Sequence, residues 1–249
     1  SVQRQIVGHQ FDEGSQNVVT VDAGKVDAAN EGKLVHVIGE ARAEAPLTDP
    51  EFGVSAPALR LTRHVEMYQW KEEKKETKKG KEKVVSYTYT QVWSDSKPKT
   101  RFEEPKGHTN PEKMPYDDTT IDAAGARLGA FQLTSDQLKQ ITSRDPLVVT
   151  EEMLKDSAKE GLSVTDDGQV YVPVSPDGGP GEPEVGDVRL KYSVVPYGTM
   201  TVVAQQRGGS FQPYKATAGD DVDIVKTGSH EAREMFASAH SSNQLLAGV

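Results

Sequence analysis

Cysteine is absent from this chain, which excludes disulfides, thiolate metal sites and a cysteine nucleophile. Apolar runs are short, and none reaches the ~18 residues that a membrane-spanning helix requires. The sequence also lacks an N-x-S/T glycosylation sequon, a signal peptide and a starting methionine. We therefore expect an excised fragment or a processed chain.

Hydrophobic residues are scarce as well, at 35% of 249 residues. A chain of this length forms one large domain or two modest ones, here with a lean core and much loop or solvated surface. Valine outnumbers leucine by 28 to 13, which favours strands over helices. The net charge of −9 argues against nucleic acid as a partner.

The clearest local pattern is a β-hairpin with strands at 59–70 and 84–94. Two sets of side chains alternate along each of these segments, which is typical of strands. Between them, residues 71–83 contain seven lysines, four glutamates, one threonine and Gly80. We interpret this charged segment as a solvated hairpin end that blocks edge-to-edge association, with a contact for an anionic partner as the alternative.

Other segments read as short strands, turns and helices. A strand at 33–38 is ended or bulged by Gly39, and Asp167-Gly168 predicts a tight hairpin turn. Short helices are expected at 135–142, capped by Ser135 or Thr134, and at 151–160 and 230–240. Together these elements predict an α+β fold, mainly antiparallel β, with curled or barrel-like sheets and about three short helices.

No catalytic motif stands out, because the sequence lacks G-x-S-x-G, a P-loop, a dinucleotide fingerprint and H-E-x-x-H. We therefore assign no catalytic residue, metal site or cofactor. Two polar pairs remain as candidates for an acid–base or ligand site: His64 with Glu66 on one strand face, and His108 with Asn110 in a loop fixed by Pro111. A salt-linked strand face and ordinary turn structure explain the same residues.

Aromatic side chains gather on the predicted hairpin. They form either a groove for a peptide or a lipid headgroup, or ordinary cross-strand packing pairs. With one methionine they make up our candidate interaction site, which consists of Met67, Tyr68, Trp70, Tyr87, Tyr89 and Trp93.

Six segments stand in a specific order along the chain, at 32–39, 46–53, 59–70, 107–111, 183–187 and 203–208. The run Val65-Glu-Met-Tyr-Gln-Trp70 is the most specific, and residues 231–243 are similar as well. In this order the segments resemble the transmembrane protein 43 (LUMA) family.

The resemblance implies an extramembrane domain, with one membrane helix before it and several after it in the full-length proteins. We expect this domain at 31–243, after a loosely structured segment at 1–30 and before a tail at 244–249. Its expected parts are two possible β subdomains and a C-terminal helix, at 31–145, 146–228 and 229–242.

The resemblance also implies partners and a location. Family members in animals are associated with the inner nuclear membrane, emerin, lamins and homo-oligomers. We expect the membrane (through spans absent from this chain), a homo-oligomer and other membrane proteins as partners. The domain would face the periplasm in a bacterial member, or the endoplasmic-reticulum lumen and nuclear envelope in an animal member.

Two functions fit these expectations. We favour a membrane-anchored scaffold or interaction domain that organises membrane protein complexes. The alternative is a membrane-surface enzyme or a receptor for a small ligand or lipid headgroup, for which the family offers no catalytic residue to transfer.

Overall fold

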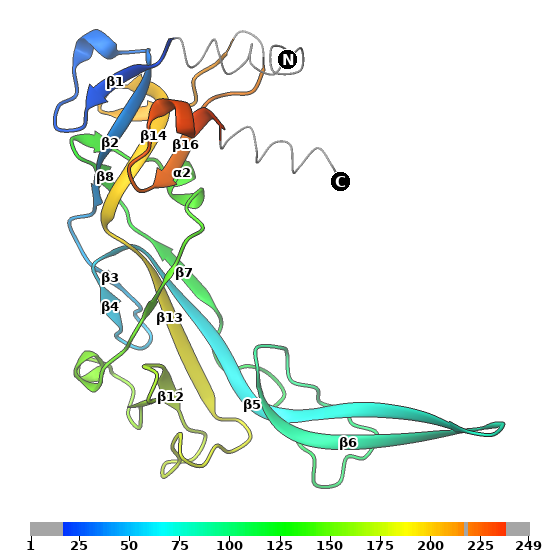
Figure 1. Ribbon diagram of the computed structural model, residues 1–249. Helices are drawn as coiled ribbons and strands as arrows, with labels where there is room; N and C mark the ends of the chain where they lie inside the picture. Colours follow the sequence, from blue (N-terminus) through cyan, green and yellow to red (C-terminus); the bar gives the residue numbers. More distant parts are fainter. Residues whose placement is uncertain (1–16, 217–218, 238–249) are drawn as a thin grey trace.

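A computed structural model describes residues 17–216 and 219–237. They form an elongated body from which a long β-hairpin projects sideways, so that the molecule has the outline of an L (Figure 1). The first and last described residues lie at one end of the body, and the hairpin leaves from the other end.

The end of the body drawn at the top of Figure 1 is a seven-stranded sheet, here called the upper sheet. Its strands follow the order β15-β14-β2-β8-β9, with β1 parallel to β2 and β16 antiparallel to β14. The bounds are β1 Val19–Asp22, β2 Leu34–Arg42, β8 Arg127–Leu128, β9 Phe131–Gln132, β14 Gly198–Arg207, β15 Ser210–Gln212 and β16 Ile224–Thr227.

The upper sheet curls until its outer strands meet. The Gln132 amide donates to the Gly209 carbonyl at 2.7 Å, and the rings of Phe131 and Phe211 stack with centroids 5.1 Å apart. This contact joins β9 to β15 and gives the sheet the predicted barrel-like form.

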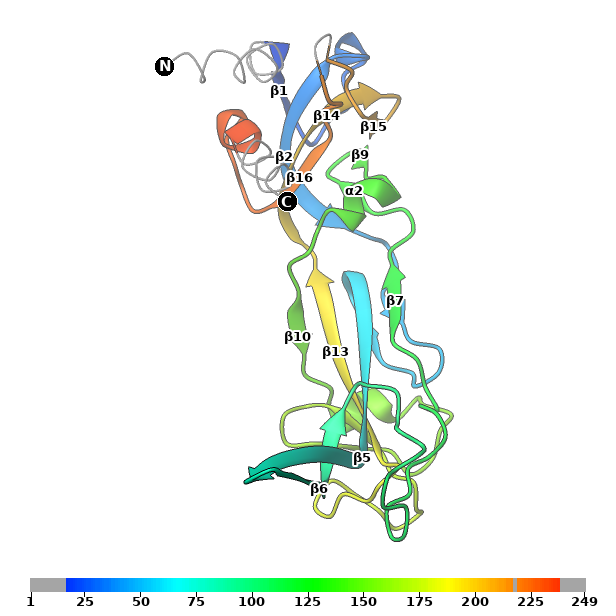
Figure 2. The ribbon, with the colours of Figure 1, turned by 90° about the vertical axis from the view of Figure 1, so that its right-hand side faces the viewer.

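The lower sheet also has seven strands, all antiparallel, in the order β11-β12-β13-β5-β6 with β10 beside β13 and β7 beside β5. Figure 2 shows β10, β13, β5 and β7 side by side. The bounds are β5 Ala58–Lys79, β6 Glu82–Ser94, β7 Thr119–Asp122, β10 Asp145–Leu147, β11 Ser163–Val164, β12 Val170–Val172 and β13 Val188–Pro196.

Short elements complete the fold. The helix α2 begins after Thr134, which forms the predicted N-cap and a capping box with Gln137. The helix α2 has the bounds Ser135–Lys139. The other short elements are the 3-10 helices η1 Ala28–Asn30 and η2 Glu151–Leu154, the hairpin β3 Leu47–Thr48 with β4 Ser55–Ala56, and a helical turn at 232–237. The strand-rich, mainly antiparallel fold with few short helices is the predicted class.

The two sheets share one core. The strand β13 passes through Tyr197 directly into β14, and one cluster of buried residues includes Leu61 and Leu190 of the lower sheet and Val35 and Val202 of the upper sheet. Each sheet takes strands from both 31–145 and 146–228, so the strand pairing does not follow that division. The domain boundaries themselves stay a prediction.

The projecting part of the β5–β6 hairpin, residues 71–90, is here called the arm. Residues 58–70 of β5 lie between neighbouring strands, and their side chains alternate between buried and half-buried, as the sequence predicted. Within the described chain, the two strands of the arm pair with each other alone, out to Lys79 opposite Glu82. The charged segment is therefore a continuous two-stranded ribbon closed at Gly80, whose φ is 65°.

Two local predictions were wrong. The strand β2 runs through Gly39 without ending there. A Cβ at this position would lie 2.7 Å from the Cβ of Ala23, so the glycine serves close packing. The helix predicted at 151–160 is only η2, because 155–160 has no apolar face and Ser157 packs against Gly53 instead.

The ends of the chain are described in part. Residues 19–30 hold β1 and η1, and the predicted C-terminal helix is helical at 232–237. Residues 229–231 of that predicted helix are described and are not helical, whereas residues 1–16, 238–242 and the predicted tail at 244–249 lie outside the described residues.

Candidate functional site

The candidate interaction residues lie at the base of the arm and along it. In the register of β5 and β6, Tyr68 is opposite Trp93 and Glu72 is opposite Tyr89, so these side chains share one face of the hairpin. The half-buried members are Tyr68, Trp70, Tyr87, Tyr89 and Trp93. Met67 points to the opposite face and is only 1% exposed, within the core. It therefore supports the fold and offers no contact surface.

The rings near Tyr68 tie the hairpin to β12 and β13. The Tyr68 and Trp93 rings have centroids 5.2 Å apart, and the Trp93 and Tyr171 rings form a T-shaped pair at 5.8 Å. The Arg189 guanidinium lies 4.4 Å from the Trp93 ring centre and also binds Glu66 with contacts of 3.3 and 3.2 Å. These side chains form a packed layer, as the cross-strand interpretation expected.

A second group of rings holds residues 95–118 against the base of the arm. The His108 ring stacks on Tyr89 at 3.7 Å and forms a T-shaped pair with Trp70 at 4.9 Å, while Phe102 contacts Tyr89 at 5.8 Å. The Nδ1 atom of His108 donates to the Glu104 carbonyl at 2.8 Å, because a carbonyl oxygen can only accept. His108 is thus packed between rings within a folded loop.

Glu72 connects the arm to the same loop through charge. Its carboxylate accepts hydrogen bonds from the Lys99 ammonium at 2.6 Å, the Tyr89 hydroxyl at 2.6 Å and the Glu103 amide at 2.8 Å. These bonds lower the pKa of Glu72 to about 2. Burial and the bond to Glu72 raise the pKa of Tyr89 to about 12. Both groups therefore keep one charge state over the whole physiological range.

Asn110 extends the sheet by imitating a strand. Its side-chain oxygen accepts from the Trp70 amide at 2.7 Å, and its side-chain nitrogen donates to the Trp70 carbonyl at 3.0 Å. The nitrogen also donates to the Lys99 carbonyl at 3.0 Å, and the residue is only 6% exposed. Asn110 therefore fixes the point at which the arm leaves the body.

The segment 183–187 also bonds to the backbone of β5, at Tyr68, two residues before Trp70. The Tyr68 amide donates to the Asp187 carbonyl, and the Gly186 amide donates to the Tyr68 carbonyl, each at 2.8 Å. The buried Asp187 carboxylate accepts from the Tyr171 hydroxyl and from the Val174 amide. Burial and this bond raise the pKa of Tyr171. Two of the segments that carry the family resemblance, 107–111 and 183–187, therefore set the direction of the arm.

A third such segment, 46–53, contains half of a buried ion pair. Asp49 and Arg63 have side chains that are each 3% exposed, and they meet at 2.9 Å. The Tyr192 hydroxyl donates to Asp49 at 2.6 Å, and Arg63 also donates to the Asp117 carbonyl. Burial alone would lower the pKa of Arg63, but Asp49 outweighs this effect and the pKa is raised. This network locks the β3–β4 hairpin onto the lower sheet.

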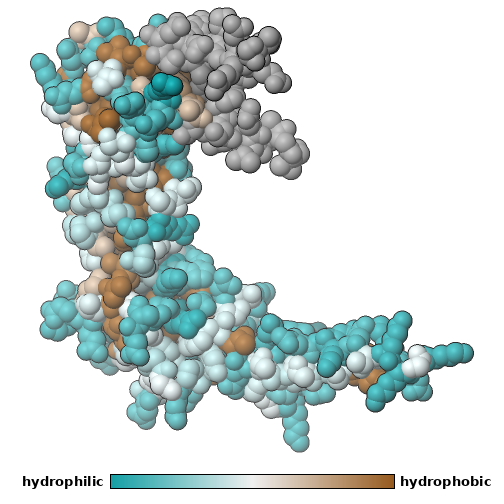
Figure 3. Space-filling model, in the orientation of Figure 1, coloured by the Kyte–Doolittle hydropathy of each residue, from teal (hydrophilic) through white to brown (hydrophobic). Residues whose placement is uncertain are grey.

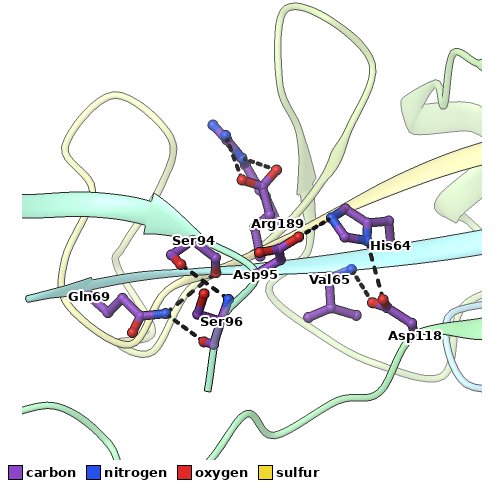
Figure 4. Close-up of polar contacts among 9 residues, drawn as sticks. His64, Val65, Gln69, Ser94, Asp95, Ser96, Asp118 and Arg189 are labelled. Carbon is purple, nitrogen blue, oxygen red and sulfur yellow. Dashed lines mark hydrogen bonds and ion pairs between the residues drawn. The ribbon is translucent and has the colours of Figure 1, made fainter. Parts of the chain in front are cut away.

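The two candidate polar pairs do not come together. His64 lies between Asp95 and Asp118, at 3.4 and 3.2 Å (Figure 4). Six residues of extended strand, about 20 Å, separate His64 from Trp70, the residue that contacts His108. Glu66 is engaged by Arg189 and Asn110 by the backbone. Each pair has a structural role in a different place, and no common cleft joins them among the described residues.

Sequence reasoning missed several residues of this region, chiefly Glu72, Phe102, Asp187 and Arg189. Glu72 was assigned to the charged segment 71–83, and its partners lie 17 to 31 positions away along the chain. Only the family segment containing Asp187 carried a signal. Within the described ranges no group of three or more His, Asp or Glu side chains could hold a metal ion.

The sequence matches a family model for transmembrane protein 43 over residues 67–248. Curated relatives named transmembrane protein 43 are 33% identical in rat and 31% identical in human, each over 94% of this chain. The chain belongs to the transmembrane protein 43 family. A homolog from the fruit fly is 28% identical over 83% of this chain.

The chain spans about 60% of the length of the rat and human transmembrane protein 43 relatives. No helix in the described part of this family member is long and apolar enough to cross a bilayer. No solved structure matches the chain.

Proposed function

We propose that this domain is an interaction domain of a membrane protein, which organises membrane protein complexes through the arm. Membership of the transmembrane protein 43 family supports attachment to a membrane. The proposal includes membrane spans outside this chain, homo-oligomers and other membrane proteins as partners, and exposure on the periplasmic or lumenal side.

The projection of the arm is the observation that carries this proposal. A two-stranded ribbon on its own is marginally stable in water, since it has no third strand or layer to bury a face. Here the outer part of the 22-residue strand β5, from Lys71 to Lys79, forms such a ribbon, and Asn110, Glu72 and stacked rings fix its base. A projection that is anchored this carefully at its base, and whose outer strands pair only with each other within the described chain, is suited to reach another molecule.

The position of the chain ends supports a sideways reach. The first and last described residues both lie at the upper-sheet end, opposite the base of the arm (Figure 1). Spans before and after the domain would hold that end near the membrane. The arm leaves the body at the opposite end, so it is free to reach neighbouring copies or other membrane proteins.

Removal of the arm tests the proposal. Residues 74–87 are replaced by Asn-Gly, which joins Glu73 to Thr88. This pair lies six residues before the native closing pair, Lys79 and Glu82. Hydrogen-bonded and non-hydrogen-bonded pairs alternate along an antiparallel ribbon, so both pairs are of the same kind and both suit a two-residue turn. Crosslinking of the full-length protein in membranes is expected to lose its higher-mass species, while the body keeps its cooperative unfolding.

The matched control is Tyr214→Ala, a truncated aromatic residue in the upper-sheet half, which should leave the crosslinked species intact. A second variant, Tyr68→Ala with Trp70→Ala, keeps the arm but loosens its base, and should weaken assembly less than the deletion does. Unchanged crosslinking in the folded arm deletion would refute the proposal.

A further inference from the structure

The outermost part of the arm is basic. This tip, residues 75–86, contains five lysines and two glutamates, on a chain whose net charge is −9. Lys83 contacts Glu76 at 3.1 Å. Within the described part of the chain the other four have no ion pair, namely Lys75, Lys78, Lys79 and Lys81. The tip therefore presents uncompensated positive charge far from the acidic remainder.

Two lysines of the tip are placed against each other. Lys78 is directly opposite Lys83 in the ribbon, and like charges in that position destabilise a strand pair. Solubility and the blocking of edge-to-edge association are served by lysines at the tip, but neither requires two lysines to face each other. An anionic partner would relieve this repulsion, which is typical of a local conflict kept for function.

The tip also exposes apolar surface on both of its faces. Val84 is 42% exposed and Val85 is 41% exposed, and as neighbours in a strand they point to opposite faces. Figure 3 shows hydrophobic surface among the hydrophilic side chains near the end of the arm. A folded protein partner would cover one face of the ribbon, whereas a lipid headgroup layer surrounds whatever enters it.

The composition of the tip favours lipid over protein in a second way. Protein interfaces are enriched in Trp, Tyr and Arg and depleted in Lys and Glu. Residues 75–86 contain no Trp, Tyr or Arg, and seven of them are Lys or Glu. Long lysine side chains bury their aliphatic stems in the interface while the ammonium groups remain at the level of the phosphates.

We propose that the tip of the arm docks into the headgroup layer of a bilayer that contains anionic phospholipid. The lysines contact lipid phosphates, and Val84 and Val85 lie against the upper acyl chains. The nine residues 71–79 extend about 30 Å from the body, so the tip reaches a surface that the body does not touch. This contact goes beyond the scaffold role and does not depend on it.

Flotation of the 249-residue chain with lipid vesicles tests the inference. The chain should bind phosphatidylcholine vesicles that contain phosphatidylglycerol, should bind pure phosphatidylcholine poorly, and should be released by salt. The variant Lys78→Glu, Lys79→Glu, Lys81→Glu should bind about two orders of magnitude more weakly, because each lysine near anionic lipid contributes roughly a factor of five. Val84→Ser with Val85→Ser should bind several-fold more weakly and keep the salt dependence.

The matched control is Lys25→Glu, Lys33→Glu, Lys113→Glu, which makes the same change in net charge on exposed lysines outside the arm. Equal loss of binding in this control would assign the effect to net charge and overturn the inference. Absence of binding to anionic vesicles by the folded chain would overturn it as well. If the tip variant binds vesicles normally but loses crosslinks between proteins, the tip contacts an acidic protein surface; the lipid contact is then wrong and the scaffold role stands.

Discussion

The charge of Glu72 holds the loop at 95–118 against the base of the arm. Its carboxylate receives three hydrogen bonds from the loop and from the opposite strand, although it lies in a segment of the sequence that reads as a solvated charge run. Its side chain is only 6% exposed, compared with 58% for the neighbouring Glu73. Two adjacent glutamates thus have different roles because they point to opposite faces of one strand.

Glu72 should make the stability of the chain depend on acid. Its pKa is lowered from 4.5 to about 2 in the folded state, so its contribution is complete above about pH 4.5 and is lost as pH falls toward 2. Glu72→Gln should therefore lower the urea midpoint at about pH 6, and the difference from the parent should shrink at about pH 3. Glu73→Gln, on the opposite face, should show little difference at either pH. A Glu72→Gln deficit that stays constant with pH would contradict this account.

At the scale of single elements, β2 shows how a glycine can serve packing inside a strand. Gly39 pairs with Met200 of β14, and Ala23, in the connection between β1 and β2, packs against it. A Cβ at this position would meet Ala23 at 2.7 Å and Leu128 at 3.4 Å. The glycine therefore allows the β1–β2 connection to lie on the strand.

Gly39→Ala should destabilise the chain by about 1–3 kcal/mol, since the added methyl group forces Ala23 away. Addition of Ala23→Gly should restore part of the loss, because it removes the atom that the new methyl group meets. Urea unfolding of the two single variants and the double variant measures the coupling between the sites. Additive losses would show that Ala23 is not what the glycine accommodates.

At the scale of the whole molecule, the L shape divides one strand between two environments. The inner half of β5 lies in the lower sheet between other strands, and its outer half belongs to the free arm. Stability in such a molecule should differ along the strand, because sheet neighbours protect only the inner part.

Amide hydrogen exchange should reveal this division. Amides of residues 58–70 should exchange slowly and those of 75–79 much faster, although both lie in β5. Anionic vesicles should slow exchange at the tip, while neutral vesicles should not. Uniform protection along β5 would mean that the arm is stabilised by something other than its single strand pairing.

Much of the fold could be predicted from the sequence where its signals were local. Alternation along 59–70, the Thr134 cap and the turn at Gly168 all predicted what the structure contains. The failures at Gly39 and at 151–160 depended on Ala23 and Gly53, which are distant in sequence and close in space. For the candidate site, the sequence located the aromatic hairpin but included the buried Met67, and it missed Glu72 and Arg189.

The sequence by itself determined the strands, the hairpin and the family, because periodicity, capping residues and ordered motifs are properties of short segments. Only the tertiary structure decided which sheet each strand joined, that Asp49 forms a buried ion pair with Arg63, and that the charged segment is a projecting ribbon. Those outcomes depend on burial shared between distant segments, and local periodicity does not specify a partner. The chain folds without cysteine and without long apolar runs, because a lean core shared by the two sheets holds the body together. The arm lies outside that core.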